Sequence, residues 1–550
     1  MAKNEVANIG SQKINNFWLM AGLLVILLAT SMSRDIFRPF YGLHSWAEAH
    51  SNWAARVHAK YGLGYTKGFS TRVVGDNLPE KPYRYMDHPQ AEPLISAVFF
   101  KLFGYEEWVL RTVNIVTTSI TLIILILITR GLCDDKTALL TGTIFCLFPL
   151  MAYFGVHQWL YVFAVGAIYN YLILTDEIQK PYFSQKTYRI LLAVCLAMSI
   201  QLSWEGFFFA FGIGFYYVAS IIFRKKHIDW NLLCILFFAP VISLLIVFLI
   251  MAAGIEWDMQ RIVDLFMWRA GTGEMLEHNW GAWFSKLWEF MVLDYTFPVM
   301  IIVILYITIG QLFVFMETKP AGNNKIRARQ FPLLLLFLLI PTLQIFLLKG
   351  CLWRHQTWLR PFSLFISIAG AQGILLAGDM FTKFSKKISS YIQILLVLVC
   401  LISSIKGSNY FYNIRWQAEP KIEMLKKLNL LIPPKESLLS FEDFIVNQNE
   451  AKGAFYRPEV AWYLDRDIVM ASTLEEIQEK AMTGKYPYYL MPLSDFDRQT
   501  TAYLNNLSTQ LGKIYNYEYI HGVKGETTKD GKFLKAGMSN YLLFDLSKKK

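Results

Sequence analysis

The run "FWLMAGLLVILLATSMS", residues 17–33, is long and apolar enough to cross a lipid bilayer as a helix. A helix needs about 20 such residues to span the hydrocarbon layer. The composition agrees over the whole chain, because 54% of its 550 residues are hydrophobic and only 17% are charged. This is the composition of a membrane protein rather than of a cytosolic enzyme, and we expect no nucleic-acid partner despite the net charge of +11.

Ten further apolar runs follow the first one. They lie near residues 112–129, 137–155, 158–175, 190–203, 206–223, 232–253, 296–316, 331–349, 361–378 and 391–405. No small-residue cleavage pattern ends the first run, so we interpret it as an uncleaved anchor. The sequence therefore predicts a polytopic α-helical membrane protein with about eleven transmembrane helices.

The Lys and Arg residues of the loops predict which side each loop faces. With a cytoplasmic N-terminus, every inner loop is basic, as the positive-inside rule requires. The inner residues are Arg130, Lys136, Lys180, Lys186, Arg189, Arg224, Lys225, Lys226, Lys319, Lys325, Arg327, Arg329, Lys383, Lys386 and Lys387. An odd number of crossings then places the first loop, 34–111, and the C-terminal segment outside the cytoplasm. We expect a multi-pass protein of a bacterial inner membrane whose site is extracytoplasmic.

The last part of the chain changes character. Short apolar runs at 436–441, 467–471, 486–493, 513–523 and 540–546 alternate with polar helical stretches and predict strands. Thr473, three residues before Glu476, predicts a capping box at the start of one helix. We therefore predict two domains: a transmembrane domain over 1–408, with the first outer loop in it, and a soluble extracytoplasmic α/β domain over 409–550.

The first outer loop contains "HSWAEAHSNWAARVHAKYG", residues 44–62. At 100° per residue, Trp46, His50 and Trp53 share one side of a helix, and His44, Glu48 and Asn52 share the other. Indole rings favour the headgroup level, so the pattern predicts a helix lying on the membrane surface with Glu48 turned toward the protein. The alternative is an ordinary interfacial helix whose polar face is only solvated.

This helix is followed by "DHPQAEPLISAVFFKLFGYEEWVLR", residues 87–111. The combination resembles membrane glycosyltransferases of family 39, which have the GT-C fold and include protein O-mannosyltransferases and lipid A aminoarabinose transferases. The matching positions are His44, Trp46, Glu48, Ala49, Ala55, Arg56, His88, Pro89, Pro93, Leu94, Gly104, Glu107 and Arg111. The sequence departs from the pattern at Ala47, Gln90 and Ala91.

The resemblance implies a reaction. Such enzymes take a sugar from a polyprenyl-phosphate carrier outside the cytoplasm and pass it to a lipid, glycan or protein acceptor. This chain would then be a hexosyl- or pentosyltransferase that inverts the anomeric centre, with a polyprenyl-phosphate-linked sugar and the bilayer as its partners. The sugar and the acceptor stay open.

The same resemblance suggests roles for individual residues. Glu48 is the candidate base for the acceptor, since a carboxylate within hydrogen-bond reach can take its proton. Asp87 would orient His88 or, together with Glu48, bind Mg²⁺ or Mn²⁺; the alternative for Asp87 is a solvated turn residue. The leaving phosphate gains negative charge, so cationic hydrogen-bond donors should be aimed at it. For it we select His88 first and His355 second, followed by His44, Arg84, Arg269 and Arg360.

Two other classes of protein remain as alternatives. A polyprenyl-linked glycan ligase or polymerase would look similar in sequence, although its activity would usually depend on a later outer loop. A secondary transporter would place ionisable residues in the middle of its spans and show two similar halves. Neither a metal nor a cofactor can be assigned, because no pair of histidines meets a zinc spacing with a third ligand.

Overall fold

The computed structural model describes residues 2–550 except 41, 77, 157–160, 180–182, 226, 272–278, 311–322, 383, 414–417, 442–444, 450–452, 494–497 and 522–539. The chain divides into two compact units. We call Met1–Ile36, Asp87–Glu92 and Leu110–Tyr412 the bundle unit, and Phe37–Met86, Pro93–Val109 and Asn413–Lys550 the sheet unit. Most of the predicted first outer loop thus groups with the C-terminal segment rather than with the membrane helices.

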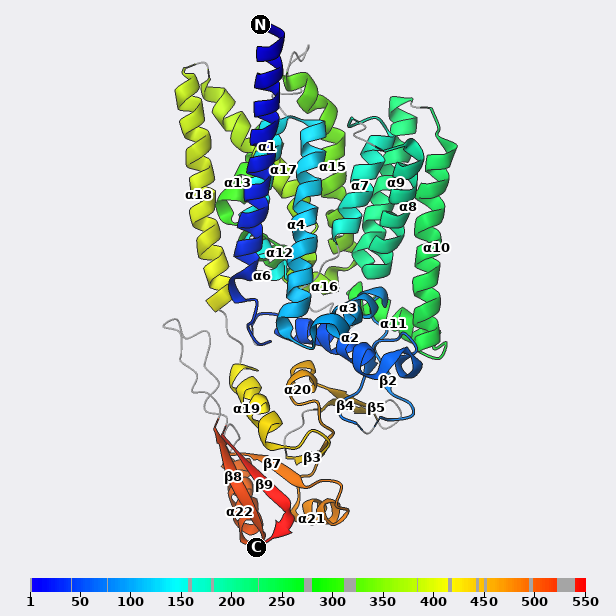
Figure 1. Ribbon diagram of the computed structural model, residues 1–550, viewed down its shortest axis with the longest axis vertical. Coiled ribbons are helices and arrows are strands. Elements are labelled where there is room, and N and C mark those ends of the chain that lie inside the picture. Colours follow the sequence, from blue (N-terminus) through cyan, green and yellow to red (C-terminus); the bar gives the residue numbers. More distant parts are fainter. Residues whose placement is uncertain are drawn as a thin grey trace. The chain divides into compact units, whose positions relative to one another are not determined.

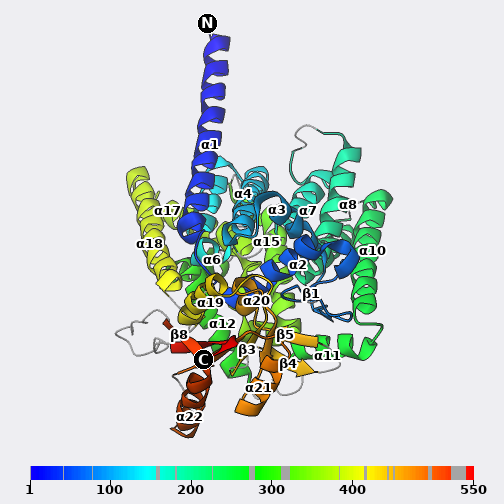
Figure 2. The same ribbon diagram turned by 60° about the horizontal axis from the view of Figure 1, so that its bottom comes forward.

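The bundle unit is made of helices that run side by side (Figure 1), with α18 and α10 at opposite edges in both views (Figure 2). Its helices are α1 (Ala2–Met32), α4 (Glu107–Leu132), α5 (Asp135–Cys146), α6 (Pro149–Phe154), α7 (Tyr161–Leu174), α8 (Gln185–Leu202), α9 (Trp204–Arg224), α10 (Trp230–Gly254), α11 (Met259–Arg269), α12 (Trp280–Tyr295), α13 (Phe297–Leu305), α15 (Asn323–Leu347), α16 (Lys349–Arg354), η4 (Gln356–Leu359), α17 (Phe362–Phe381) and α18 (Lys386–Asn413).

Six helices among the described residues are long and apolar enough to cross a membrane. A bent pair, α12 with Phe297–Ile309, is either a broken seventh span or a re-entrant loop. The prediction of a polytopic helical membrane protein is therefore confirmed, but the described residues do not confirm the count of eleven. The run 137–155 is broken, because α5 ends at Cys146 and Pro149 starts α6. The run 158–175 yields only the short helix α7. Lys180, Lys226, Lys319 and Lys383, used in the loop argument, lie outside the described residues.

The turn at Ser203 separates α8 from α9, as the sequence predicted. The Ser203 side chain accepts a hydrogen bond from the backbone N–H of Glu205 at 3.2 Å and caps α9. Gly206 then lies against the backbone of Ser199, where an added Cβ would stand only 2.2 Å from its carbonyl group. This close approach places the start of α9, and with it Glu205, inside the bundle unit.

A sharp bend of 107° separates α12 from Phe297–Ile309. Thr296 at the bend has φ 69°, a left-handed backbone conformation, and Pro298 follows in the first turn of α13. Proline suits a first turn because it has no N–H to leave unpaired. The bend buries Asp294 and Tyr295, each with none of its surface exposed.

The sheet unit contains α2 (Ser45–Thr66), β1 (Thr71–Arg72), β2 (Tyr83–Arg84), α3 (Ala91–Phe103), which begins in the bundle unit, α19 (Ala418–Leu431), β3 (Leu438–Ser440), β4 (Ile445–Asn449), β5 (Gly453–Tyr456), α20 (Pro458–Tyr463), β6 (Ile468–Met470), α21 (Leu474–Met482), β7 (Tyr488–Pro492), α22 (Arg498–Ile514), β8 (Tyr515–His521) and β9 (Asn540–Lys549). Five strands form one mixed sheet in the order β6-β3-β7-β9-β8. The predicted strands and the capping box at Thr473 and Glu476 are confirmed.

Helix α2 forms as predicted, but part of its aromatic side is buried inside the sheet unit. Trp53 has none of its surface exposed, and its indole N–H donates to the carbonyl of Val73 at 3.0 Å. The guanidinium of Arg72 covers the Trp53 ring at 4.8 Å. Only Trp46 remains substantially exposed. The helical side predicted to face lipid is therefore partly packed against strand β1 of its own unit.

His58 on α2 makes the stability of the sheet unit depend on pH. Only 2% of its surface is exposed, its Nδ1 lies 2.9 Å from the Thr66 hydroxyl, and burial lowers its pKa to about 4. The unfolded chain binds a proton below pH 6.5 whereas the folded chain stays neutral, so folding stability falls as pH drops from about 6.5 toward 4. At pH 5 this loss is about 2 kcal/mol.

We therefore expect that His58→Gln has a smaller loss of unfolding free energy between pH 7.5 and pH 5 than the wild type. Denaturant unfolding of the purified chain at both pH values measures it. Equal losses in the two proteins would show that His58 is not responsible.

Candidate functional site

Two of the predicted phosphate ligands meet in the bundle unit. Nη2 of Arg269 lies 3.3 Å from Nε2 of His88, although the residues are 181 positions apart. A guanidinium can only donate, so a hydrogen bond at this contact has the His88 ring nitrogen as its acceptor. The Gln90 side chain donates to the His88 carbonyl at 2.6 Å and fixes the turn. The pair places a guanidinium beside an imidazole, and both groups can donate hydrogen bonds to an oxyanion.

Arg269 is positioned by close backbone packing. It is the last residue of α11, and only 7% of its surface is exposed. A Cβ on Gly350 would stand 3.1 Å from the carbonyl oxygen of Arg269. Gly271, with φ 75°, lies in turn against Lys349. Glycine is therefore needed at both positions, and the start of α16 holds the end of α11 in place.

Asp87 and His355 also lie in the bundle unit. The indole N–H of Trp204 donates to the backbone carbonyl of Asp87 at 3.0 Å, which ties the turn before His88 to the start of α9. His355 is half-buried between α16 and η4. The next residue, Gln356, donates to Oδ1 of Asp294 at 3.0 Å.

Arg360, between η4 and α17, is the centre of a buried polar cluster. Only 2% of its surface is exposed, and its three side-chain nitrogens have no hydrogen-bond partner among the described residues. It lines a small hollow with Tyr161 and Ser363. The guanidinium charge acts on the carboxyl groups of Glu205 and Asp294. A guanidinium without such counter-charges would be costly at this depth.

The carboxyl groups of this cluster have further partners. The Tyr161 hydroxyl donates to Oε2 of Glu205 at 2.6 Å, and the Gln344 side chain donates to Oε1 at 3.4 Å. Oδ2 of Asp294 is buried without a hydrogen-bond partner among the described residues. The sequence did not select Asp294, because this residue lies two positions before the predicted run 296–316. From the sequence alone, Glu205 is interpreted as an ordinary polar residue at the end of a span.

Glu92 adds an ionisable group near Arg360. Burial raises the pKa of its carboxyl to about 7, while the charge of Arg360 acts in the opposite direction. Near neutral pH this carboxyl is therefore partly protonated, in contrast to an exposed glutamate. It follows the His88 turn in the sequence and was not predicted as part of the site.

The remaining predicted residues belong to the sheet unit. Glu48, in the first turn of α2, is buried with 4% of its surface exposed. His44 caps the start of the same helix with a left-handed backbone, φ 57°. Arg84 on β2 covers the ring of Phe69 at 4.6 Å. Among the described residues, no three His, Cys, Asp or Glu side chains gather closely enough to hold a metal ion.

Comparisons with known proteins agree with this architecture. Residues 87–244 match a family model described as dolichyl-phosphate-mannose-protein mannosyltransferase. The fold matches ArnT from Cupriavidus metallidurans bound to undecaprenyl phosphate with a TM-score of 0.55 at 11% identity, over 96% of this chain and 97% of that chain. For apo ArnT the TM-score is 0.54 at 11% identity, over 97% and 98% of the two chains.

A more distant structure shares the fold. The Archaeoglobus fulgidus oligosaccharyltransferase in complex with Zn and sulfate matches with a TM-score of 0.50 at 14% identity, over 91% of this chain and 72% of that one. A search of curated proteins finds no match to the chain. The chain thus has the GT-C fold of membrane glycosyltransferases, and the resemblance predicted from the motifs of the first outer loop is confirmed.

Proposed function

We propose that this protein transfers a sugar from a polyprenyl-phosphate carrier to a lipid, glycan or protein acceptor at the extracytoplasmic face of the bacterial inner membrane. The observation that carries this proposal is the contact between His88 and Arg269. His88 lies in the segment that matches the mannosyltransferase model. The GT-C fold supports the same class of reaction.

In the proposed reaction, the acceptor hydroxyl or amine attacks the anomeric carbon and inverts it. Its proton passes to Glu48, and the electron pair of the breaking C–O bond leaves with the phosphate. Arg269 and His88 stabilise the charge that the phosphate gains, because donors aimed at a developing anion lower the barrier. Asp87 and Gln90 hold the turn that presents His88.

The other predicted ligands have supporting or open roles. Arg360 stays a predicted ligand of the sugar donor. Its three side-chain nitrogens, which have no hydrogen-bond partner in the described part of the chain, are consistent with an oxygen ligand in the adjoining hollow. Contacts with the polyprenyl-phosphate sugar stay predicted for His355, His44 and Arg84. A Mg²⁺ or Mn²⁺ ion between Glu48 and Asp87 remains a prediction as well.

The proposal is tested by offering the purified, reconstituted protein polyprenyl-phosphate sugars labelled in the sugar, together with a cell-envelope extract. We expect label in a lipid, glycan or protein fraction, and the fraction identifies the acceptor class. Protein-free vesicles are the control. No transfer from any polyprenyl-phosphate sugar tried would contradict the proposal.

Donor binding is expected to weaken when the phosphate ligands are removed. A hydrogen bond to a charged group contributes about 1.5–3 kcal/mol, so His88→Ala and Arg269→Ala should each raise the KM for the donor about 10- to 100-fold. The double variant should lose less than the product of the two effects, because the side chains contact each other.

Matched controls are available elsewhere in the same unit. His227 is exposed, and Arg261 lies on the same helix as Arg269. Their alanine variants should keep the wild-type KM. Unchanged KM values in His88→Ala and Arg269→Ala would remove both residues from the donor site.

A further inference from the structure

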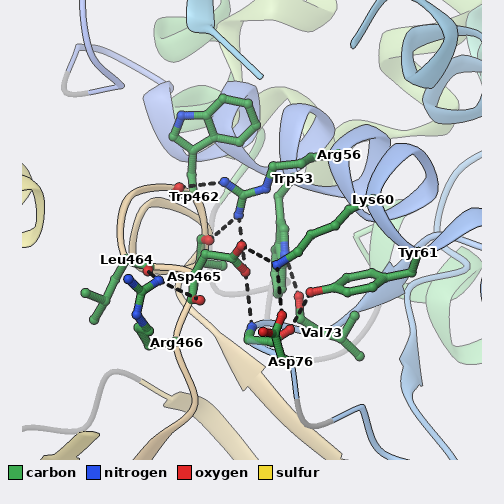
Figure 3. Close-up of polar contacts among 12 residues, drawn as sticks. Trp53, Arg56, Lys60, Tyr61, Val73, Asp76, Trp462, Leu464, Asp465 and Arg466 are labelled. Carbon is green, nitrogen blue, oxygen red and sulfur yellow. Dashed lines mark hydrogen bonds and ion pairs between the residues drawn. The ribbon is translucent and has the colours of Figure 1, made fainter. Parts of the chain in front are cut away.

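Within the sheet unit, one carboxylate of the C-terminal segment joins two parts of the N-terminal loop. Nζ of Lys60 on α2 donates to Oδ2 of Asp465 at 2.7 Å (Figure 3). The backbone N–H of Gly75 donates to Oδ1 of Asp465 at 3.1 Å. Arg56, one helical turn before Lys60 and on the same face of α2, has Nη2 3.8 Å from that oxygen. Asp465 therefore connects α2 and the segment after β1 to the turn that precedes β6.

Arg56 strengthens this attachment at the end of α20. Its guanidinium donates to the carbonyl of Trp462 at 2.7 Å and to that of Ala461, and it lies 4.6 Å from the centre of the Trp462 ring. Carbonyls at the end of a helix lack donors within the helix. A side chain of α2 thus caps a helix more than 400 residues away in the sequence. Figure 3 shows Arg56 and Lys60 extending from α2 toward this turn.

The turn that carries Asp465 is itself held firmly. Arg466 donates to the carbonyls of Ile432 and Pro433, just beyond α19, each at 3.1 Å. The carbonyl of Asp467 accepts from the backbone N–H of Leu438 on β3 at 2.8 Å. Asp465 has a left-handed backbone, φ 48°, which aspartate tolerates better than most residues. Its carboxylate therefore projects from a turn that is held in place by the end of α19 and by the sheet.

Gly75 packs closely against this turn. Its φ is 67°, and a Cβ would stand 3.2 Å from the side chain and the backbone nitrogen of Asp467. The Tyr61 hydroxyl donates to the Gly75 carbonyl at 2.5 Å. The segment after β1 is thus held between α2 and the turn, so a movement of α2 would have to break several contacts together.

The position of α2 matters because Glu48 lies on it. Glu48 is 12 positions before Lys60, which is about 18 Å along a straight helix. A small tilt at Arg56 and Lys60 would therefore displace the Glu48 carboxylate noticeably. A base must lie within hydrogen-bond reach of the proton it accepts, and a displacement of about 1 Å can cost about 100-fold in rate.

We propose that Asp465 is a positioning residue for the transfer reaction: through Lys60, Arg56 and Gly75 it fixes the direction of the helix that carries Glu48. This inference rests on the proposed function, and it assigns a structural role in the reaction to the C-terminal segment. The segment holds the helix of the base rather than contacting the donor itself.

The test uses the purified full-length protein with Asp465→Asn and Asp465→Ala. Asparagine keeps the acceptor for Gly75 and tolerates the left-handed backbone, but it lacks the charge that Lys60 pairs with. We expect kcat to fall about 10- to 100-fold in the alanine variant and less in the asparagine variant. The KM for the donor should stay within twofold in both. Hydrogen–deuterium exchange should rise in peptides of residues 45–66 and stay unchanged in β3 and β7.

Two comparisons separate positioning from a general loss of structure. Asp135→Asn breaks the exposed Arg130–Asp135 ion pair, which also measures 2.7 Å, and should change neither kcat nor exchange in α2. Lys60→Met should lower kcat, and Lys60→Met combined with Asp465→Asn should be no slower than the slower single variant, because both remove one contact.

The outcomes distinguish a failure of the proposed function from a failure of the positioning role of Asp465. A wild type that transfers no sugar would refute the proposed function, while exchange in 45–66 would still decide whether Asp465 holds α2. An active wild type with an Asp465→Ala variant of equal kcat and equal exchange would overturn the inference. Increased exchange throughout the sheet would overturn it too, since Asp465 would then support the fold as a whole rather than α2.

Discussion

Replacing Glu48 by Gln is expected to lower kcat for sugar transfer about 100- to 10,000-fold, the range that a general base contributes. Glutamine has nearly the same shape but cannot accept the acceptor's proton. Because Glu48 is buried, with 4% of its surface exposed, a change that keeps its volume should leave the packing of α2 intact. The KM for the donor should change little, since the proposed phosphate ligands are other residues.

Glu475→Gln is a matched control, because Glu475 is an exposed residue on α21 of the same unit. It should transfer sugar at the wild-type rate. Circular dichroism and size-exclusion chromatography of the purified variants establish that both fold. A Glu48→Gln protein as active as the wild type would remove Glu48 as the base and favour the alternative of a polyprenyl-linked glycan ligase or polymerase.

Replacing Arg360 by Met is expected to lower the free energy of unfolding by about 3–5 kcal/mol, the usual effect of removing one partner from a buried group of charges. Methionine fills part of the space but leaves Glu205 and Asp294 without their cation. Arg360→Lys should lose less, because it keeps a positive charge. Denaturant unfolding in one detergent measures all three proteins.

A second substitution tests the electrostatic cause. Asp294→Asn added to Arg360→Met removes one of the uncompensated acids and should recover part of the lost stability. Full wild-type stability in Arg360→Met alone would show that the carboxyl groups do not depend on the guanidinium. Loss of donor binding in Arg360→Lys at near-normal stability would support its predicted role as a donor ligand.

Hydropathy predicted the bundle well where a span is one continuous helix. Helices α9 and α10 are examples. In a membrane, a run of about 20 apolar residues can satisfy its backbone hydrogen bonds in few structures other than a helix. The prediction did not find the places where a helix breaks inside an apolar run. Pro149 starts α6 within one run, and the bend at Thr296 carries Asp294 into the bundle. Hydropathy averages over such residues. Pro149 inside the run 137–155 was the signal available for the first break, whereas Asp294 lies just before the run 296–316 and gave none.

The site was predicted in part. The spacing around His88 and the sign of Arg269 were enough to select both residues, yet their contact spans 181 positions and has no local signal. The sequence favours an interfacial anchor at Trp53, because nothing local shows that Val73 and Arg72 fold back onto α2 and bury this side chain. Likewise, the partners of Arg56 lie more than 400 positions away. Only long-range packing decides such roles.

The source of the transferred sugar tests the account most directly. The reconstituted wild-type protein is given, in separate reactions, a sugar label on polyprenyl phosphate and the same label on a nucleotide, and both the labelled product and the free polyprenyl phosphate are measured. We predict that label moves only from the lipid carrier, with one polyprenyl phosphate released for each sugar transferred. Label moving from the nucleotide sugar while the lipid-linked sugar stays intact would contradict the account.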